Sequence, residues 1–141
     1  MNYKKNTQVH AIKPLSLDKL GFYYLDLTET LADYTNSGYG EFDSEGIPKM
    51  GKGDKAYYNQ VVIMNYGFAL HTEVLRLINV EGNKKKLKKI INWLDQNKTE
   101  IDNYVIWKSQ TPYARYGLKS GLALGITQGK AISFYLRMYE L

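Results

Sequence analysis

Two long stretches of the chain are apolar on nearly every side of a helix, and they constrain the fold more than any other feature. The first runs from Asn59 to Asn79 and the second from about Leu124 to Leu141. A helix that is apolar all round is expected to be buried, whereas a surface helix shows one apolar stripe. The sequence therefore predicts two buried helices, and its 44% of hydrophobic residues suffice for a core around them.

The segment between these stretches, Lys84–Asn97, has the pattern of a surface helix. Its apolar residues recur at i, i+3, i+4 and i+7 on one stripe, and lysines fill the opposite side. Glu81–Asn83 is predicted to break the preceding helix, with Asn83 as the N-cap of this one. In that register three lysines occupy the first turn, where the helix dipole disfavours them. The stripe is Leu87, Ile90, Ile91 and Leu94, and the lysines are Lys84, Lys85, Lys86, Lys88 and Lys89.

Buried, exposed and buried helices therefore alternate along the chain. Helical hairpins whose first members form an inner ring and whose second members form an outer ring give this alternation, as in α/α toroids. A three-helix bundle is the alternative, although each of its helices should show a single apolar stripe. We predict a mainly α fold, a partial α/α toroid-like array of helical hairpins preceded by a short extended or β segment.

We divide the chain into a loose tail (residues 1–20), an extended strand and loop segment (residues 21–56) and a helical domain (residues 57–141). Phe22–Leu27 is rich in strand-forming aromatics and predicts a strand, and Tyr104–Trp107 predicts a second, short one. The last helix reaches Leu141 without a closing Gly, Asn or polar turn, so we expect the helical domain to be truncated.

Composition excludes several classes of function. The chain has no cysteine, which rules out thiol catalysis and Cys-ligated zinc, and its two histidines are far apart, so we predict no metal site. No nucleotide-binding or serine-hydrolase motif is present, and we predict no cofactor. Residues 1–14 lack the apolar core of a signal peptide, and no apolar run reaches the ~20 residues of a membrane span. We expect a soluble chain, whose compartment the sequence does not assign.

Charge and aromatic content indicate the class of partner. The net charge of +5 suits a polyanion, either a nucleic acid or an acidic polysaccharide, and the 13 tyrosines are typical of clefts that stack on sugars or bases, or of ordinary core packing. A nucleic-acid binder would use the lysine helix, but that helix carries no interleaved aromatics for base stacking. We therefore expect an anionic polysaccharide as partner and no nucleic acid.

Three blocks of the sequence resemble the helical C-terminal domain of the D-glucuronyl C5-epimerase family: Tyr57–Gly67, Tyr116–Lys119 and Thr127–Ser133. The first helix of that family typically reads Tyr-Asn-Pro-Val-x-Ile-Ala-Gln-Tyr-Gly, of which the first block keeps Tyr58, Asn59, Val61, Ile63, Tyr66 and Gly67 in register. Of the family's later Ser-Ala-Met-Ala-Gln-Gly-Gln block, this chain keeps only the central Gln-Gly pair. The order of the blocks agrees over about residues 20 to 141.

The family inverts the carbon that bears the carboxylate in glucuronyl residues of heparan-type polysaccharides, so the resemblance implies an isomerase. That chemistry needs an acid and a base on opposite sugar faces and cations near the carboxylate. The family's acid and base lie C-terminal to the Gln-Gly pair, beyond Leu141, so we assign no catalytic residue. The resemblance implies a partial or truncated epimerase-like protein that binds or acts on a uronate-containing polysaccharide without turnover. The alternative is a non-catalytic helical module that binds carbohydrate or a protein.

Arg115, Tyr116 and Lys119 are candidates for binding the uronate. They lie in the loop before the last helix, and in a toroid such loops sit at the mouth of the cleft. A guanidinium beside a tyrosine can hold a carboxylate by paired hydrogen bonds. The competing interpretation is a solvated loop.

Tyr57, Tyr58 and Asn59 would share that mouth, where the backbone amides of a helix N-terminus favour an anion. Their competing interpretation is an aromatic staple and a helix cap. Gln128, a polar residue on an apolar helix, either reaches a sugar hydroxyl or ties neighbouring elements together.

For several other polar residues the sequence gives less support for a role in a functional site. His71 is interpreted as a core or boundary histidine, and Asn65 has the same two interpretations as Gln128. Asp26, Asp43 and Glu45 could be the paired carboxylates of a glycosidase, although nothing in the sequence fixes their separation. Finally, inner helices without partners would expose apolar faces, which predicts a homo-oligomer through those faces.

Overall fold

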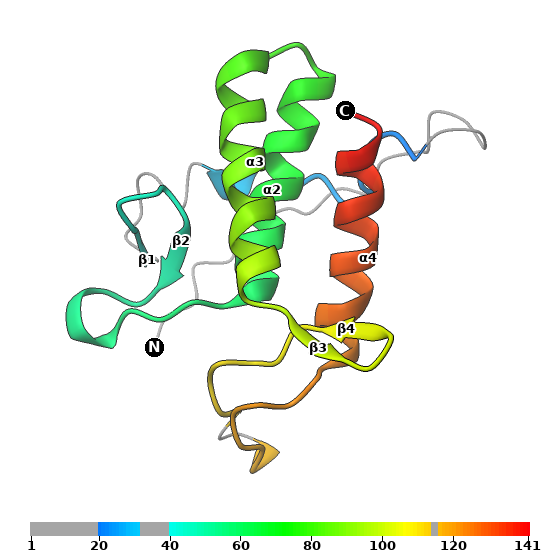
Figure 1. Cartoon of the computed structure of the whole chain (residues 1–141). Helices are drawn as coiled ribbons and strands as arrows, with labels where there is room; N and C mark the ends of the chain where they lie inside the picture. Colours follow the sequence, from blue (N-terminus) through cyan, green and yellow to red (C-terminus); the bar gives the residue numbers. More distant parts are fainter. Residues whose placement is uncertain (1–19, 32–39, 114–115) are drawn as a thin grey trace.

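In the computed structural model, which describes residues 20–31, 40–113 and 116–141, helix α2 (Gln60–Leu75) packs against both α3 (Val80–Gln96) and α4 (Gly125–Tyr139). The three helices stand side by side, with α3 antiparallel to α2 and α4 parallel to it (Figure 1). The N-terminal ends of α2 and α4 therefore lie at the same end of the molecule. The prediction of a mainly helical fold is confirmed.

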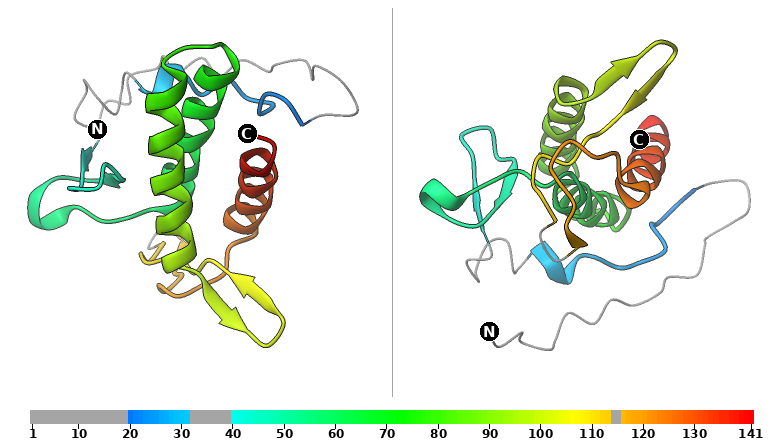
Figure 2. Two further views of the ribbon diagram at one scale, coloured as in Figure 1. Left: turned by 45° about the horizontal axis from the view of Figure 1, so that its top comes forward. Right: turned by 90° about the horizontal axis from the view of Figure 1, so that it is seen from below.

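α2 is buried on almost every side, as its apolar sequence predicted. Five of its residues, Ile63, Met64, Phe68, Ala69 and Thr72, are 0% exposed. Its neighbours enclose it from several directions, as the view along the helices in Figure 2 shows. Asn59 forms the N-cap of α2, and its side-chain oxygen accepts hydrogen bonds from the N–H groups of Val61 (3.0 Å) and Val62 (3.3 Å).

α3 is the predicted surface helix, but it begins at Val80 rather than Lys84. The chain turns at Leu77 and Asn79, both in the left-handed region with φ of 61° and 43°. Asn83 is therefore not an N-cap; it is buried inside the helix, and its amide donates to the Glu73 carboxylate at 2.8 Å. With this earlier start the first turn holds Glu81 instead of the lysines, which removes the predicted conflict with the helix dipole.

α4 matches its predicted bounds closely, but the prediction that it is buried all round is wrong. One stripe, formed by Thr127, Ala131, Phe134 and Arg137, is buried. Ile132 and Tyr139 on the opposite side are 62% and 92% exposed. Sequence alone did not show this because large apolar residues occur on both faces of the helix.

Two small antiparallel hairpins complete the fold. β1 (Gly40–Phe42) pairs with β2 (Pro48–Met50), and a short 3-10 helix, η1 (Gly53–Lys55), follows. β3 (Thr99–Ile101) pairs with β4 (Tyr104–Ile106), which confirms the predicted short strand there. Phe22–Leu27, by contrast, does not form the predicted strand. Its aromatic residues serve packing instead, because Tyr23 stacks on Phe68 with ring centroids 3.9 Å apart.

The contact between α2 and α4 depends on a glycine. A Cβ added at Gly67 would lie 2.5 Å from Cε2 of Phe134, so only a residue without a side chain admits this ring. Phe134 in turn meets Phe68 edge to face, with centroids 5.5 Å apart. Among the described residues, no helix is long and apolar enough to cross a bilayer.

We predict that Gly67→Ala lowers the free energy of unfolding by about 1–3 kcal/mol, because the methyl group overlaps the Phe134 ring and must push α4 outward. Gly129→Ala is the matched control on α4, where a Cβ would meet nothing within 4 Å. That change should instead stabilise by about 0.5–1 kcal/mol through helix propensity. Urea unfolding of both variants tests this, and equal effects would contradict the packing described.

Candidate functional site

A polar groove of about 340 Å³ lies between the β1–β2 turn and the outer side of α3. Its floor is aromatic and apolar, and its walls carry amides, a cation and carboxylates. The lining residues are Asp43, Glu45, Ile47, Lys89, Asn92, Trp93 and Gln96. On α3 the lining positions 89, 92, 93 and 96 recur at i, i+3, i+4 and i+7, so one face of the helix forms one wall.

Asp43 organises the turn side of this groove. Its carboxylate accepts hydrogen bonds from the N–H groups of Glu45 (2.9 Å) and Ile47 (2.8 Å) and from the Tyr58 hydroxyl (2.7 Å). Burial alone would raise the pKa of Asp43, but the hydrogen bonds from Ile47, Tyr58 and the turn amides outweigh it and hold the pKa below its ordinary value. The carboxylate is therefore ionised and committed to the turn, so Asp43 cannot serve as a general acid at neutral pH.

Tyr58 joins the turn to α3. Its ring lies 5.2 Å from that of Trp93, and the Lys49 ammonium lies 5.2 Å from its centroid. The hydrogen bond to the Asp43 carboxylate, with some burial, raises the pKa of Tyr58 to about 12. This phenol keeps its proton at neutral pH, whereas a catalytic tyrosine base needs a cationic neighbour that lowers its pKa.

Lys89 closes one side of the groove. Its ammonium lies 3.3 Å from the Glu45 carboxylate and donates to the Glu45 backbone oxygen at 3.0 Å. The pair is exposed, so its contribution to stability is small, of the order of 0–1 kcal/mol. Asn92 and Gln96 beside it are exposed amides, which donate and accept hydrogen bonds as sugar hydroxyls do.

The other predicted residues at the start of α2 have structural partners. Tyr57 pairs with Met50 through its backbone, and its hydroxyl lies 3.8 Å from the Met50 sulfur. The side-chain oxygen of Asn59 already occupies the amides at the N-terminus of α2, where the sequence analysis placed an anion. The cap interpretation of Asn59 is therefore the one that its geometry supports.

Gln128 ties α4 to the end of the second hairpin. Its side-chain oxygen accepts from the Trp107 N–H at 3.1 Å, and its amide donates to the Trp107 carbonyl at 2.7 Å. Gln60 makes a parallel tie from α2 to the Lys108 carbonyl, also at 2.7 Å. These two amides anchor the long connection at the N-terminal ends of both helices.

The loop candidates lie beyond this anchor. Tyr116 and Lys119 are exposed, and Arg115 falls outside the described residues. Tyr58 contacts Asp43 and α3, whereas Gln128 contacts the residue after β4, so the predicted site residues belong to two separate contact networks.

The three carboxylates that could have formed a glycosidase pair each have other partners, and Glu45 is paired with Lys89. Asp26 is held by Arg76, with Nη2 2.7 Å from Oδ2, and Asp43 and Glu45 belong to one turn in another network. Among the described residues no three His, Cys, Asp or Glu side chains gather as metal ligands would.

A partly buried cationic cluster between α2 and α4 escaped the sequence analysis. Lys130 donates to the Asn65 side-chain oxygen at 2.7 Å and to the Tyr23 hydroxyl at 3.3 Å. Arg137 donates to the Ser133 hydroxyl at 2.6 Å and, through its other terminal nitrogen, to a backbone carbonyl. Burial lowers the pKa of both cations. Their spacing of seven residues in an otherwise uncharged helix is the signal that could have placed them on one face.

His71 is buried beside this cluster, which supports its interpretation as a core histidine. Burial, and secondarily the nearby Arg137, lowers the pKa of His71 to about 4. The imidazole is therefore neutral at pH 7.

Comparison of the chain with protein-family models, with curated proteins and with solved structures finds no match in any of the three. The geometry described above therefore carries the functional argument.

We predict that the free energy of unfolding falls as the pH is lowered from 6.5 to about 4. In this range an unfolded His71 binds a proton that the folded one does not, so acid favours unfolding with a slope of up to about 1.4 kcal/mol per pH unit. Denaturant unfolding of wild type and His71→Gln across this range measures the difference in slope. Identical slopes in both proteins would contradict a buried neutral imidazole.

Proposed function

We propose that this chain is a non-catalytic helical module that binds an anionic, uronate-containing polysaccharide in the groove between the β1–β2 turn and α3. The observation that carries the proposal is the composition of this groove. Trp93 lines its floor, the exposed amides of Asn92 and Gln96 stand on its wall, and the Lys89 ammonium lies at its side.

These groups match the chemistry of a sugar chain. Amides exchange hydrogen bonds with the hydroxyls of a pyranose. Trp93 is only 9% exposed, so it supplies an apolar floor rather than a ring on which a sugar could stack. Lys89 balances the charge of Glu45, so the ionised Asp43, whose oxygens accept three hydrogen bonds, leaves the groove lining itself with one net negative charge. Exposed lysines in the preceding turns of α3, Lys85 and Lys86, add positive charge that suits uronate carboxylates.

We propose a module without catalytic activity because of the protonation states of Tyr58 and Asp43. The high pKa of Tyr58 keeps its proton in place, and Asp43 is fixed as a carboxylate. Abstracting a proton next to a carboxylate needs a poised base and a facing acid, and neither residue is poised for that task.

A more specific hypothesis is that the three helices form a partial α/α toroid-like array that resembles the helical domain of the glucuronyl C5-epimerases. Parallel α2 and α4 would then be successive inner helices, with the antiparallel α3 on the outer ring. The burial of α2 and the lysine-covered face of α3 support this arrangement. A three-helix bundle remains the alternative architecture.

We predict that the protein is retained on immobilised heparosan and that Asn92→Ala/Gln96→Ala weakens binding about tenfold or more, which is roughly 1.4 kcal/mol. Both side chains are exposed, so the change should leave the fold intact. Lys119→Ala, which removes a cation from the connecting loop, is the control and should change binding less than about twofold.

The competing outcomes are distinct. Loss of retention in Lys119→Ala with none in the groove variant would place the sugar at the loop and overturn the proposal. Retention that is unaffected by either change, yet falls steeply with salt and is matched by duplex DNA, would indicate a nonspecific basic surface instead.

A further inference from the structure

The outward face of α4 is unlike a helix face that ordinarily meets water. The helix holds two charged side chains, Lys130 and Arg137, and both turn inward onto Tyr23 and Phe68, with cations 5.2–6.0 Å from the ring centroids. A surface helix normally shows the opposite arrangement, with charges outward.

Five residues form this outward face, and they share one stripe. They recur at i, i+4, i+7, i+11 and i+14, which is the alternating spacing of the a and d positions in a coiled coil. All five are exposed, and none is charged; they are Gly125, Gly129, Ile132, Leu136 and Tyr139. We call this set the outward seam.

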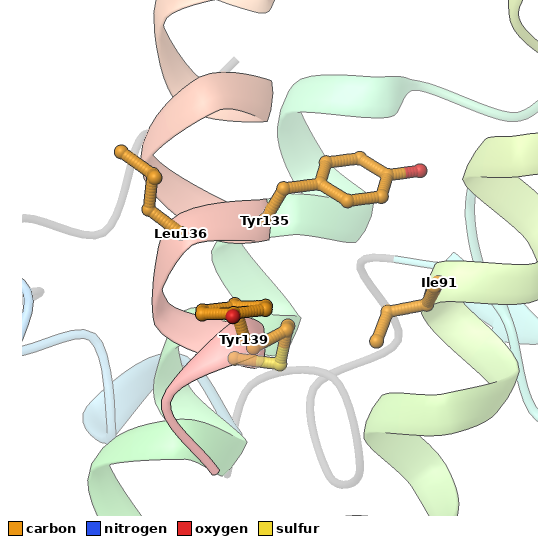
Figure 3. A pocket seen from close by; sticks show the side chains of 5 residues that line it. Ile91, Tyr135, Leu136 and Tyr139 are labelled. Carbon is orange, nitrogen blue, oxygen red and sulfur yellow. The ribbon is translucent and has the colours of Figure 1, made fainter.

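Two seam residues, Leu136 and Tyr139, also line an apolar groove of about 470 Å³ between α3 and α4. Figure 3 shows Leu136 pointing away from α3, while Tyr135 reaches toward it across the groove. Ile91 forms the facing wall. The seam therefore projects away from α3 and is accessible to a partner.

Side-chain size changes along the seam in one direction. A Cβ built at Gly125 or Gly129 would meet nothing within 4 Å, so the N-terminal half is low and open. The C-terminal half carries Leu136 and Tyr139, which are 50% and 92% exposed. A second copy laid antiparallel would place the bulky half of each seam over the low half of the other.

We infer that α4 is the interface of an antiparallel homodimer in which two outward seams pack with Ile132 near the twofold axis. The contact is isologous, as in most dimers, and the seam itself holds no charge. Beside Ile132 lie one acidic and one basic residue, Asp95 and Lys98, so charges of both signs flank the twofold axis. A parallel pair would set Tyr139 against Tyr139 and leave a gap between the glycines. This interface is independent of the polysaccharide groove, which lies on the other side of α3.

Two isoleucines of α4 make a matched test. Ile132 and Ile126 are 62% and 61% exposed, but only Ile132 lies on the seam. We expect Ile132→Glu to raise the dissociation constant of the dimer about tenfold or more, and Ile126→Glu to change it less than about threefold. Sedimentation equilibrium over a roughly 100-fold range of concentration measures both. A wild-type monomer throughout this range would overturn the inference, as would equal effects of the two variants.

Cross-linking tests the orientation even if a glutamate variant fails to fold. The chain has no cysteine, so single cysteines report without background. Ile132→Cys should form an intermolecular disulfide across the twofold axis, while Tyr139→Cys should not, because its partner position is Gly125. Efficient cross-linking of Tyr139→Cys to itself would indicate a parallel pair and contradict the antiparallel interface.

Discussion

The packing of the Phe134 ring against Gly67 is the contact on which the rest of the structure depends. It allows α4 to approach α2 closely enough for Phe134 to meet Phe68 edge to face, and Tyr23 completes the stack on the other side of Phe68. The ring also fixes how α4 is rotated about its own axis. Once Phe134 points inward, the residues on the opposite side of the helix must face out.

This rotation explains why a helix with only two charges turns both of them inward, with Arg137 buried and Lys130 half-buried. Lys130 and Arg137 lie on the same side as Phe134, and they settle over the rings of Tyr23 and Phe68. Removing cations from water is costly, and ring contacts with hydrogen bonds to amide, hydroxyl and carbonyl oxygens offset part of that cost. The aromatic stack therefore decides both the inward position of the cations and the apolar character of the outward seam.

Much of the fold follows from local pattern. The all-round apolar sequence of α2 predicted its burial, the single stripe of α3 predicted a surface helix, and the bounds of α4 were close. The errors arose where local pattern is ambiguous. Both faces of α4 carry large apolar residues, so periodicity could not tell which would be covered, and the aromatic residues of Phe22–Leu27 suit core packing as well as a strand. Asn83 suits a cap, but its amide donates hydrogen bonds to the Glu73 carboxylate and the Ile78 carbonyl instead.

The sequence predicted less of the candidate site than of the fold. Tyr58 was selected, but its partner Asp43 is 15 positions away and Trp93 lies on another helix. A groove made from a turn and a helix requires the tertiary structure, because no local spacing joins its walls. Gln128 was also selected, and its two hydrogen bonds to Trp107 bear out its role as a tie.

The most direct test of the functional account is a titration of the ¹⁵N-labelled protein with heparosan oligosaccharides, followed by backbone and indole amide shifts. The account predicts that the largest changes cluster at Glu45, Asn92, Trp93 and Gln96, with little change in the loop around Lys119. Changes confined to that loop, or spread evenly over the lysines of α3 and abolished by moderate salt, would contradict it.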